Sequence, residues 1–395
     1  MYSHLVIENQ GDHAPWEREA IDDRLGTKTL GVGCVVWVYE NPDSSTFRYR
    51  VWNMVEALRA IQFPATWCRV DEIPVLLRKL SGIGTIVLAR VRYDATVAAL
   101  IVAARSRGIR LLFDCDDLVF DTSFVHLLVD TLDLDTQSVA TFDHWFAYVG
   151  RLEATARLCD GGIATNRVLA TRMASLVGGD VRVVPNFLNR LQQEASEQLF
   201  AAKVASRFQS DQPTLIGYFS GTPSHRRDFA VAIPALARLL QQDPKVRLRI
   251  VGFLDDLGPL VEFPGQLERQ PLLNWVALQK SIAEVDVNIA PLQENAFTNC
   301  KSELKYFEAA IVGTWTIASP TVPFAAAMTT APSGQALGAI SGAEEWDSTL
   351  EDALRLARSP ERYAAAAEAA MDGIRSKYGW NRSTHLIRGA IGDIA

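Results

Sequence analysis

The segment "RLLFDCDDLVFD", residues 110–121, places four aspartates directly after an apolar run. Three kinds of site fit the carboxylates of Asp114, Asp116, Asp117 and Asp121. Neighbouring carboxylates can hold a divalent cation on a diphosphate. One carboxylate can instead attack phosphorus while a second acts as acid and base beside Mg²⁺. In the third interpretation they end a strand and accept hydrogen bonds from hydroxyl groups in a cleft.

A second segment, "NCKSELKYFEAA", combines two cations with a carboxylate. Its periodicity predicts a helix that opens near Ser302, with Lys301 at its start and Lys305 one turn further on. Helix N-termini bind anions and lysines strengthen that preference, so the segment suits a diphosphate. Glu308, about two turns in, can accept hydrogen bonds from ribose hydroxyls. The alternative is an ordinary amphipathic helix with solvated lysines.

A third segment, "IGYFSGTPSHRRDF", reads as a strand, a glycine turn and a helix. The backbone N–H groups around Gly221 and Thr222 can hold a phosphate, assisted by His225, Arg226 or Arg227. The alternative is a capped helix start with surface arginines. The sequence does not decide which of the three basic side chains would make the contact.

These segments belong to a repeating pattern of elements. Continuous apolar strands, such as 31–39, 84–90 and 109–114, alternate with helical periodicity, as in 49–63. This alternation predicts a parallel α/β sheet, and it restarts at 214–221 after a polar helical stretch. We therefore expect two doubly wound, Rossmann-like domains that face a cleft. Ligands bind such sheets at the C-terminal ends of the strands.

The length of 395 residues is itself typical of two domains. The expected boundaries, in chain order, are a loose N-terminal lead-in at 1–29, a first Rossmann-like domain at 30–190, a linker at 191–213, a second Rossmann-like domain at 214–375 and a C-terminal helix at 376–395.

Composition narrows the class of protein. Apolar residues make up 48% of the chain and charged residues 22%, which allows a substantial core. The net charge of −7, without a Lys/Arg block, argues against nucleic acid as the main partner. Five scattered cysteines without C-x-x-C spacing indicate reduced thiols in a cytoplasmic protein. No stretch approaches the ~18 apolar residues of a membrane span, although peripheral membrane contact stays open.

The segment "NCKSELKYFEAAIVGTWTIAS" resembles the nucleotide-sugar motif of GT-B glycosyltransferases, in the broad retaining group called family 4. The resemblance implies that Glu308 binds the ribose of a nucleotide sugar. The family pattern has a second glutamate eight residues earlier, where this sequence has Cys300. The form "K-S-x-L-K-Y-x-E" is similar to a bacterial polysaccharide-assembly branch that includes rhamnosyltransferases. The resemblance also implies that the first domain holds the acceptor, that the second binds the nucleotide sugar, and that the C-terminal helix crosses back to the first domain.

Two further segments carry the resemblance. "IGYFSGTPSHRRDF" is similar to a strand, loop and helix with a basic residue on the diphosphate, and "STFRYRVWNMVEAL" to a loop and helix whose Tyr-Arg pair faces the cleft. The expected site has donor-binding residues Gly221, Thr222, His225, Arg226, Arg227, Lys301, Ser302, Lys305 and Glu308, acceptor-binding residues Arg48, Tyr49 and Arg50, and catalytic residues Asp116, Asp117 and Lys301.

The expected activity is transfer of a hexosyl or deoxyhexosyl group from a UDP-, GDP- or dTDP-linked sugar to a glycan or lipid-linked acceptor. The resemblance places it in cell-surface polysaccharide assembly, in the cytoplasm or at the inner face of the membrane. No cofactor and no metal is expected, because the cationic side chains would stabilise the leaving diphosphate.

Other functions stay open at this point. A catalytically degenerate GT-B protein, partner of another transferase, would explain the missing carboxylate at Cys300. A haloacid-dehalogenase-like phosphatase would use Asp114 and Asp116, although Asp117 and Leu118 replace the Gly-Thr turn that it needs. A metal-dependent GT-A transferase has one sheet, whereas this sequence predicts two. The aspartates can also simply pair with a nearby arginine.

Overall fold

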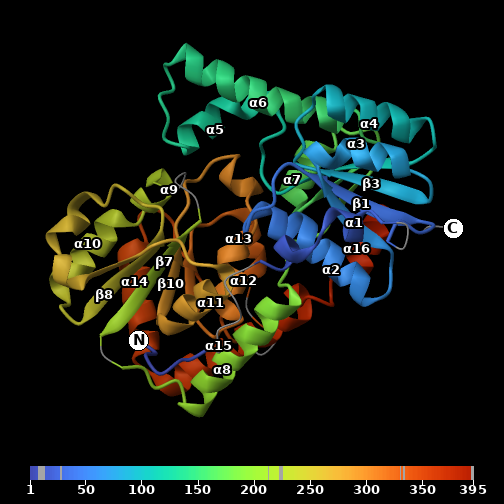
Figure 1. Cartoon of the computed structure of the whole chain (residues 1–395). Coiled ribbons are helices and arrows are strands. Elements are labelled where there is room, and N and C mark those ends of the chain that lie inside the picture. Colours follow the sequence, from blue (N-terminus) through green and yellow to red (C-terminus); the bar gives the residue numbers. More distant parts are fainter. Residues whose placement is uncertain are drawn as a thin grey trace.

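The computed structural model describes residues 1–7, 14–26, 29–211, 213–221, 226–329, 331 and 334–392. Two α/β domains lie side by side, each built on a six-stranded parallel sheet with helices on both faces (Figure 1). The predicted fold class of two doubly wound domains that face a cleft is thereby confirmed.

The first sheet has the strand order β2-β1-β3-β4-β5-β6. Its strands are β1 (Cys34–Tyr39), β2 (Ala65–Arg69), β3 (Ile83–Ala89), β4 (Arg110–Cys115), β5 (Gly161–Ala164) and β6 (Val181–Val183). Every residue of β1 is buried, as expected for a strand that helices cover on both faces. The short edge strand β2 was not predicted, because "ATWCR" has neither a continuous apolar run nor strict alternation.

The second sheet has the order β12-β11-β10-β7-β8-β9. Its strands are β7 (Thr214–Ser220), β8 (Val246–Gly252), β9 (Leu267–Gln270), β10 (Val287–Ala290), β11 (Trp315–Ala318) and β12 (Ala339–Ile340). In each sheet the order reverses beside the first strand, between β1 and β3 and between β7 and β10. Ligands bind open α/β sheets at such reversals, outside the C-terminal strand ends.

The helices cover the two sheets in chain order. Those of the first domain are α1 (Ile21–Arg24), α2 (Asn53–Ala60), α3 (Ile73–Leu76), α4 (Ala95–Arg105), α5 (Val125–Thr131), α6 (Val139–Arg157) and α7 (Arg167–Met173). They are followed by α8 (Arg190–Ala205), α9 (Arg226–Ala230), α10 (Ile233–Gln242), α11 (Trp275–Glu284), α12 (Leu304–Ala310), α13 (Val322–Ala327), α14 (Trp346–Ala357), α15 (Pro360–Tyr378) and α16 (Thr384–Ile391).

The N-terminal segment differs from the loose lead-in that the sequence predicts. Tyr2 is 1% exposed and its N–H donates to the carbonyl of Glu284 at 2.9 Å, on the second domain. Trp16 is buried against the rings of Phe47 and Trp52 of the first domain. The described residues of 1–29 are therefore held on the two domains by buried aromatic side chains. The segment is polar on average, so its composition does not reveal these few anchoring residues.

Helix α8 differs in the same way from the linker expected at 191–213. Gln192, Ser196 and Lys203 are all buried, and Lys203 donates to the Thr314 hydroxyl at 2.9 Å. The helix packs along α11 and so contributes side chains to the second domain. Its polar residues are interior contacts, so their polarity does not mark a solvated connection.

The C-terminal helix α16 lies against α2 and β6 of the first domain, so the chain returns there after α15 (Figure 1). Arg110 of β4 donates to the carbonyl of Ala390 at 3.3 Å. In the described part of the chain, no helix is long and apolar enough to cross a membrane. All five cysteines are buried and free.

Candidate functional site

A cavity of about 930 Å³ lies between the two domains. It opens where both sheets reverse their order: Tyr39 ends β1, Arg90 follows β3, Gly221 follows β7 and Leu292 follows β10, and all four line it. This volume is that of a binding site for a ligand of drug or nucleotide size.

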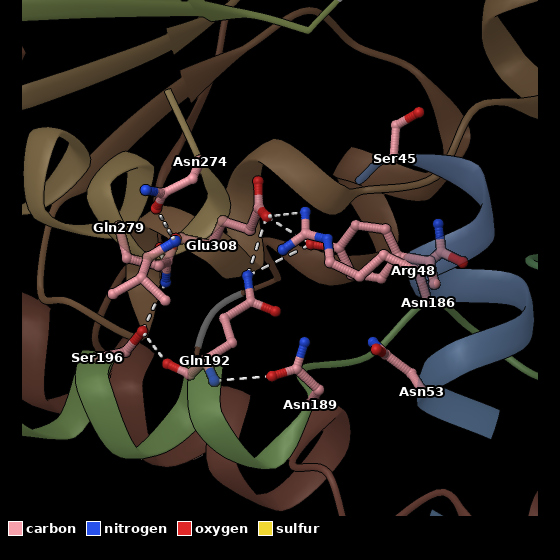
Figure 2. A network of polar contacts seen from close by, with 12 residues as sticks. Ser45, Arg48, Asn53, Asn186, Asn189, Gln192, Ser196, Asn274, Gln279 and Glu308 are labelled. Atoms are coloured by element: carbon pink, nitrogen blue, oxygen red, sulfur yellow. Dashed lines mark hydrogen bonds and ion pairs between the residues drawn. The ribbon is translucent and has the colours of Figure 1, made fainter. Parts of the chain in front are cut away.

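Glu308 of α12 is the centre of a polar network that joins the domains (Figure 2). Arg48 Nη2 donates to its Oε1 at 3.2 Å, Gln192 Nε2 at 3.0 Å, and the Tyr49 hydroxyl donates to the same oxygen. The carboxylate is 6% exposed and lines the cavity. Within the described residues its Oε2 has no hydrogen bond, so this oxygen stays free for a ligand.

Arg48 is 4% exposed, yet its Nε and Nη1 have no partner within the described residues. The side chain lines the cavity and lies over the Tyr49 ring, with Cζ 4.3 Å from the ring centroid. A buried N–H group without an acceptor costs about 1–3 kcal/mol, so two such groups favour a ligand that accepts hydrogen bonds. Both residues lie on a π-helical turn, Arg48–Trp52, of the kind found at functional sites.

Lys301, Ser302 and Lys305 also line the cavity. Lys305 donates to the carbonyl of Phe219, and the Ser302 hydroxyl accepts from Asn186 Nδ2 at 3.1 Å. Helix α12 begins at Leu304, so Lys301 lies in extended backbone before the helix instead of at its first residue. The positive charge of this wall therefore comes from the lysine side chains.

Asp116 and Asp117 line the opposite wall beside Arg90. Arg90 Nη1 lies 3.3 Å from Asp116 Oδ1 and 3.7 Å from Asp117 Oδ2, and the Thr46 hydroxyl donates to Asp116 Oδ2 at 2.9 Å. Burial, and then the charge of Asp117, raise the pKa of Asp116. A half-buried carboxylate pair beside a cation can accept hydrogen bonds from substrate hydroxyls.

Asp114 has a different position from its two neighbours. It is fully buried, and its two oxygens accept from Arg50 Nε at 2.8 Å and Nη2 at 3.0 Å. Arg50 Nη1 also donates to the carbonyl of Val184 at 2.8 Å and to Asn186 Oδ1 at 3.1 Å. The hypothesis of a phosphatase with Asp114 as its nucleophile is therefore wrong, because this carboxylate is buried and paired with Arg50, where a phosphoryl group cannot reach it.

The same geometry corrects the expected role of Arg50 in acceptor binding. Its side chain is 1% exposed, is bound to Asp114 and does not line the cavity. Arg48 and Tyr49, also expected at the acceptor, instead contact the carboxylate expected to bind the donor ribose.

The basic pair on α9 lies across from first-domain carboxylates. Arg227 Nε donates to Asp133 Oδ1 at 2.7 Å, and Arg227 also pairs with Asp130. Arg226 pairs with Asp133, and neither arginine lines the cavity. Both guanidinium groups bridge the domains in this structure instead of lining a phosphate site. Of the other residues expected here, Gly221 lines the cavity, whereas Thr222 and His225 lie outside the described residues.

Two residues of the candidate site were missed from the sequence. Gln192 was assigned to a linker, although Asn189 before it is an N-cap signal and accepts from Gln192 N at 2.8 Å. Trp275 begins α11 directly after the Asn274 N-cap and offers an aromatic face. An N-cap residue in the loop after a strand is the sequence signal that points to both positions. In the described part of the chain, no group of three or more His, Cys, Asp or Glu side chains is placed to hold a metal ion.

The sequence matches no family model and no curated protein. Solved structures are similar over most of the chain. HepE from Anabaena, in complex with UDP and glucose, has a TM-score of 0.61 at 10% identity, covering 91% of this chain and 100% of its own. Sucrose-phosphate synthase from Thermosynechococcus elongatus has a TM-score of 0.61 at 14% identity, covering 90% and 97%.

A glycosyltransferase from Rickettsia africae gives a TM-score of 0.61 at 10% identity, covering 92% of this chain and 100% of its own. The chain has the GT-B fold. In this GT-B chain the cavity is the interdomain cleft. The second domain supplies Glu308, Lys301 and Lys305 to it, and the first supplies Arg48 and Asp116.

Proposed function

We propose that this GT-B chain is a glycosyltransferase that uses a nucleoside-diphosphate sugar. The carrying observation is the pairing of Glu308 with Arg48 on the cavity wall, which leaves one carboxylate oxygen and two guanidinium nitrogens without a hydrogen-bond partner among the described residues. A carboxylate suits ribose hydroxyls, and a guanidinium suits a diphosphate. The solved structure of HepE, whose fold is similar, is a complex with UDP and glucose.

In this proposal Glu308 binds the ribose, while Arg48, Lys301 and Lys305 lie at the diphosphate. The acceptor oxygen bonds to the anomeric carbon, the bond from that carbon to the diphosphate breaks, and the hydroxyl proton leaves with the nucleoside diphosphate. Cationic side chains placed where negative charge develops lower the barrier to this step. The proposal therefore requires no metal ion for the leaving group.

The finer assignments rest on the resemblance of the segment that contains Glu308. We propose a UDP-, GDP- or dTDP-linked hexose or deoxyhexose as donor, transfer with retention as in family 4, and a glycan or lipid-linked acceptor of cell-surface polysaccharide assembly in the cytoplasm. Asp116 and Asp117 would receive the acceptor hydroxyl, because they line the wall opposite the lysines.

A donor screen tests the proposal. Nucleotide sugars are incubated with the protein, with and without EDTA, and release of the nucleoside diphosphate is measured. We expect one base and sugar to be preferred, with a rate that EDTA does not change. Loss of the rate in EDTA would contradict the metal-independent mechanism. Release of no nucleoside diphosphate from any nucleotide sugar would support the degenerate partner instead.

The pH dependence of nucleotide binding tests the role of Lys305. Burial lowers the pKa of Lys305 to about 8, against the opposing charge of Glu308. Because only the ammonium form attracts a diphosphate, the Kd for the nucleotide should rise above this pKa, by up to about tenfold per pH unit. Isothermal titration between about pH 7 and pH 9.5 measures this change.

The variant Lys305→Arg keeps its charge over this range, so its Kd should change much less with pH. Lys280→Arg, on the outer part of α11 beside Glu284, is the matched control and should follow the wild-type curve. Equal pH profiles for the wild-type protein and Lys305→Arg would exclude Lys305 from the diphosphate site.

A further inference from the structure

Helix α6 carries one apolar stripe that is buried at one end and exposed at the other. Val139, Phe142, Phe146 and Val149 share a face of the helix. Val149 is 1% exposed in the core of the first domain, whereas Val139, Phe142 and Phe146 are 73%, 40% and 47% exposed. The Phe142 and Phe146 rings stack at 6.0 Å. A contiguous exposed apolar strip of this kind marks a binding surface.

The helix turns that carry the stripe also reach the cavity with other side chains. Trp145 and Tyr148, on the same helix turns, line the cavity, and Leu128 and Leu132 of α5 and the turn after it continue this wall. Figure 1 shows α5 and α6 as a hairpin at the upper edge of the molecule, above α9. The part of the cavity wall that α5 and α6 supply is thus mainly aliphatic and aromatic.

The apolar wall begins beside the carboxylates proposed to receive the acceptor hydroxyl. Val119 follows Asp117 by two residues, and both line the cavity. A single molecule can therefore place a hydroxyl at Asp117 and an apolar group on α5 and α6.

The charges on α6 and the turn before it limit which ligand can bind to this apolar surface. Residues 134–150 contain no lysine or arginine, and they contain Asp135 and Asp143. Anionic lipid headgroups bind basic clusters, so this surface does not suit an anionic membrane. A neutral apolar group is the occupant that fits both the wall and the stripe.

We propose that the acceptor carries a neutral apolar group, such as an alkyl, prenyl or aryl chain. Its hydroxyl lies at Asp116 and Asp117, and its apolar group follows the wall of α5 and α6 and leaves along Phe142 and Phe146. This inference rests on the proposed function, and it selects an amphiphilic acceptor over a fully polar glycan.

Binding of a neutral homologous series tests the inference without requiring turnover. β-Glucosides with methyl, butyl, hexyl and octyl tails, each below its micelle concentration, are titrated calorimetrically into the full chain. We expect the affinity to rise about fourfold for each methylene that becomes buried, which corresponds to about 0.8 kcal/mol. Equal affinity for the methyl and octyl glucosides would overturn the proposal.

The double variant Phe142→Ser with Phe146→Ser should reduce the dependence on tail length to less than about twofold per methylene. Both side chains are exposed, so circular dichroism should show an intact fold. Val204→Ser on α8, 42% exposed, is the matched control and should bind as the wild type does. If ultracentrifugation shows a dimer that the double variant loses, and no tail-length dependence is found, a second copy of the chain occupies this surface and the proposal is overturned. If the double variant instead loses binding to phosphatidylcholine vesicles, again without any tail-length dependence, the surface binds a membrane and the proposal is overturned.

The donor screen separates this inference from the proposed function. Nucleotide-sugar turnover without tail-length dependence would overturn the inference of an apolar acceptor and leave the proposed glycosyltransferase function intact. Tail-length dependence without turnover of any nucleotide sugar would leave an apolar binding site and overturn the glycosyltransferase.

Discussion

Replacing Glu308 with alanine is expected to lower kcat/KM for the nucleotide sugar about 100-fold. Loss of a hydrogen bond to a charged group costs about 1.5–3 kcal/mol, and each 1.4 kcal/mol is tenfold. The substitution also removes the carboxylate that holds Arg48 across the cleft at 3.2 Å. Since Arg48 is nearly buried, its charge would then face the diphosphate without a fixed position. Steady-state kinetics of nucleotide release measures the effect.

Two further variants make this result interpretable. Glu308→Gln keeps the shape and one acceptor oxygen, so we expect a loss of about tenfold, between wild type and alanine. Glu351→Ala, on the exposed face of α14 beside Arg355, should leave kcat/KM unchanged. Thermal unfolding of each variant shows whether the alanine protein is folded. Full activity of a folded Glu308→Ala protein would remove Glu308 from the donor site.

Replacing Arg50 with alanine is expected to destabilise the first domain by about 3–5 kcal/mol, because it leaves the Asp114 carboxylate buried without its partner. Burial raises the pKa of Asp114 to about 6 even though the charge and hydrogen bonds of Arg50 oppose this shift. The carbonyl of Val184 and the side chain of Asn186 lose a donor in the same variant. Urea unfolding followed by tryptophan fluorescence measures the loss of stability.

The matched control is Arg182→Ala, which breaks an exposed pair with Asp180 in the same domain and should cost less than about 1 kcal/mol. The double variant Arg50→Met with Asp114→Leu replaces both charges by apolar groups and should recover part of the loss. Impaired acceptor use by a fully stable Arg50→Ala protein would return Arg50 to the acceptor site.

The sequence was most informative where one local pattern determines the structure. Buried parallel strands are continuous apolar runs, so β1 and β4 were predicted close to their observed bounds. The spacing of Lys301, Lys305 and Glu308 placed three charged residues in a single segment, and all three line the cavity.

The remaining features depend on contacts between distant parts of the chain. Tyr49 and Glu308 are 259 residues apart and meet across the cleft, which no local pattern records. Arg48 and Arg50 differ by two positions, yet one faces the cavity and the other is bound to Asp114, because the π-helical turn directs them apart. Helix α8 was assigned to a linker because its buried polar residues are hydrogen-bonded internally, and composition does not distinguish these from solvated ones.

Calorimetric titration of the full chain with UDP, GDP and dTDP measures whether Glu308 forms part of a nucleoside-diphosphate site. We predict that one of the three nucleotides binds at a single site, and that Glu308→Ala weakens this binding at least about tenfold. Binding of none of them, or equal binding by the wild-type protein and a folded Glu308→Ala variant, would contradict the claim.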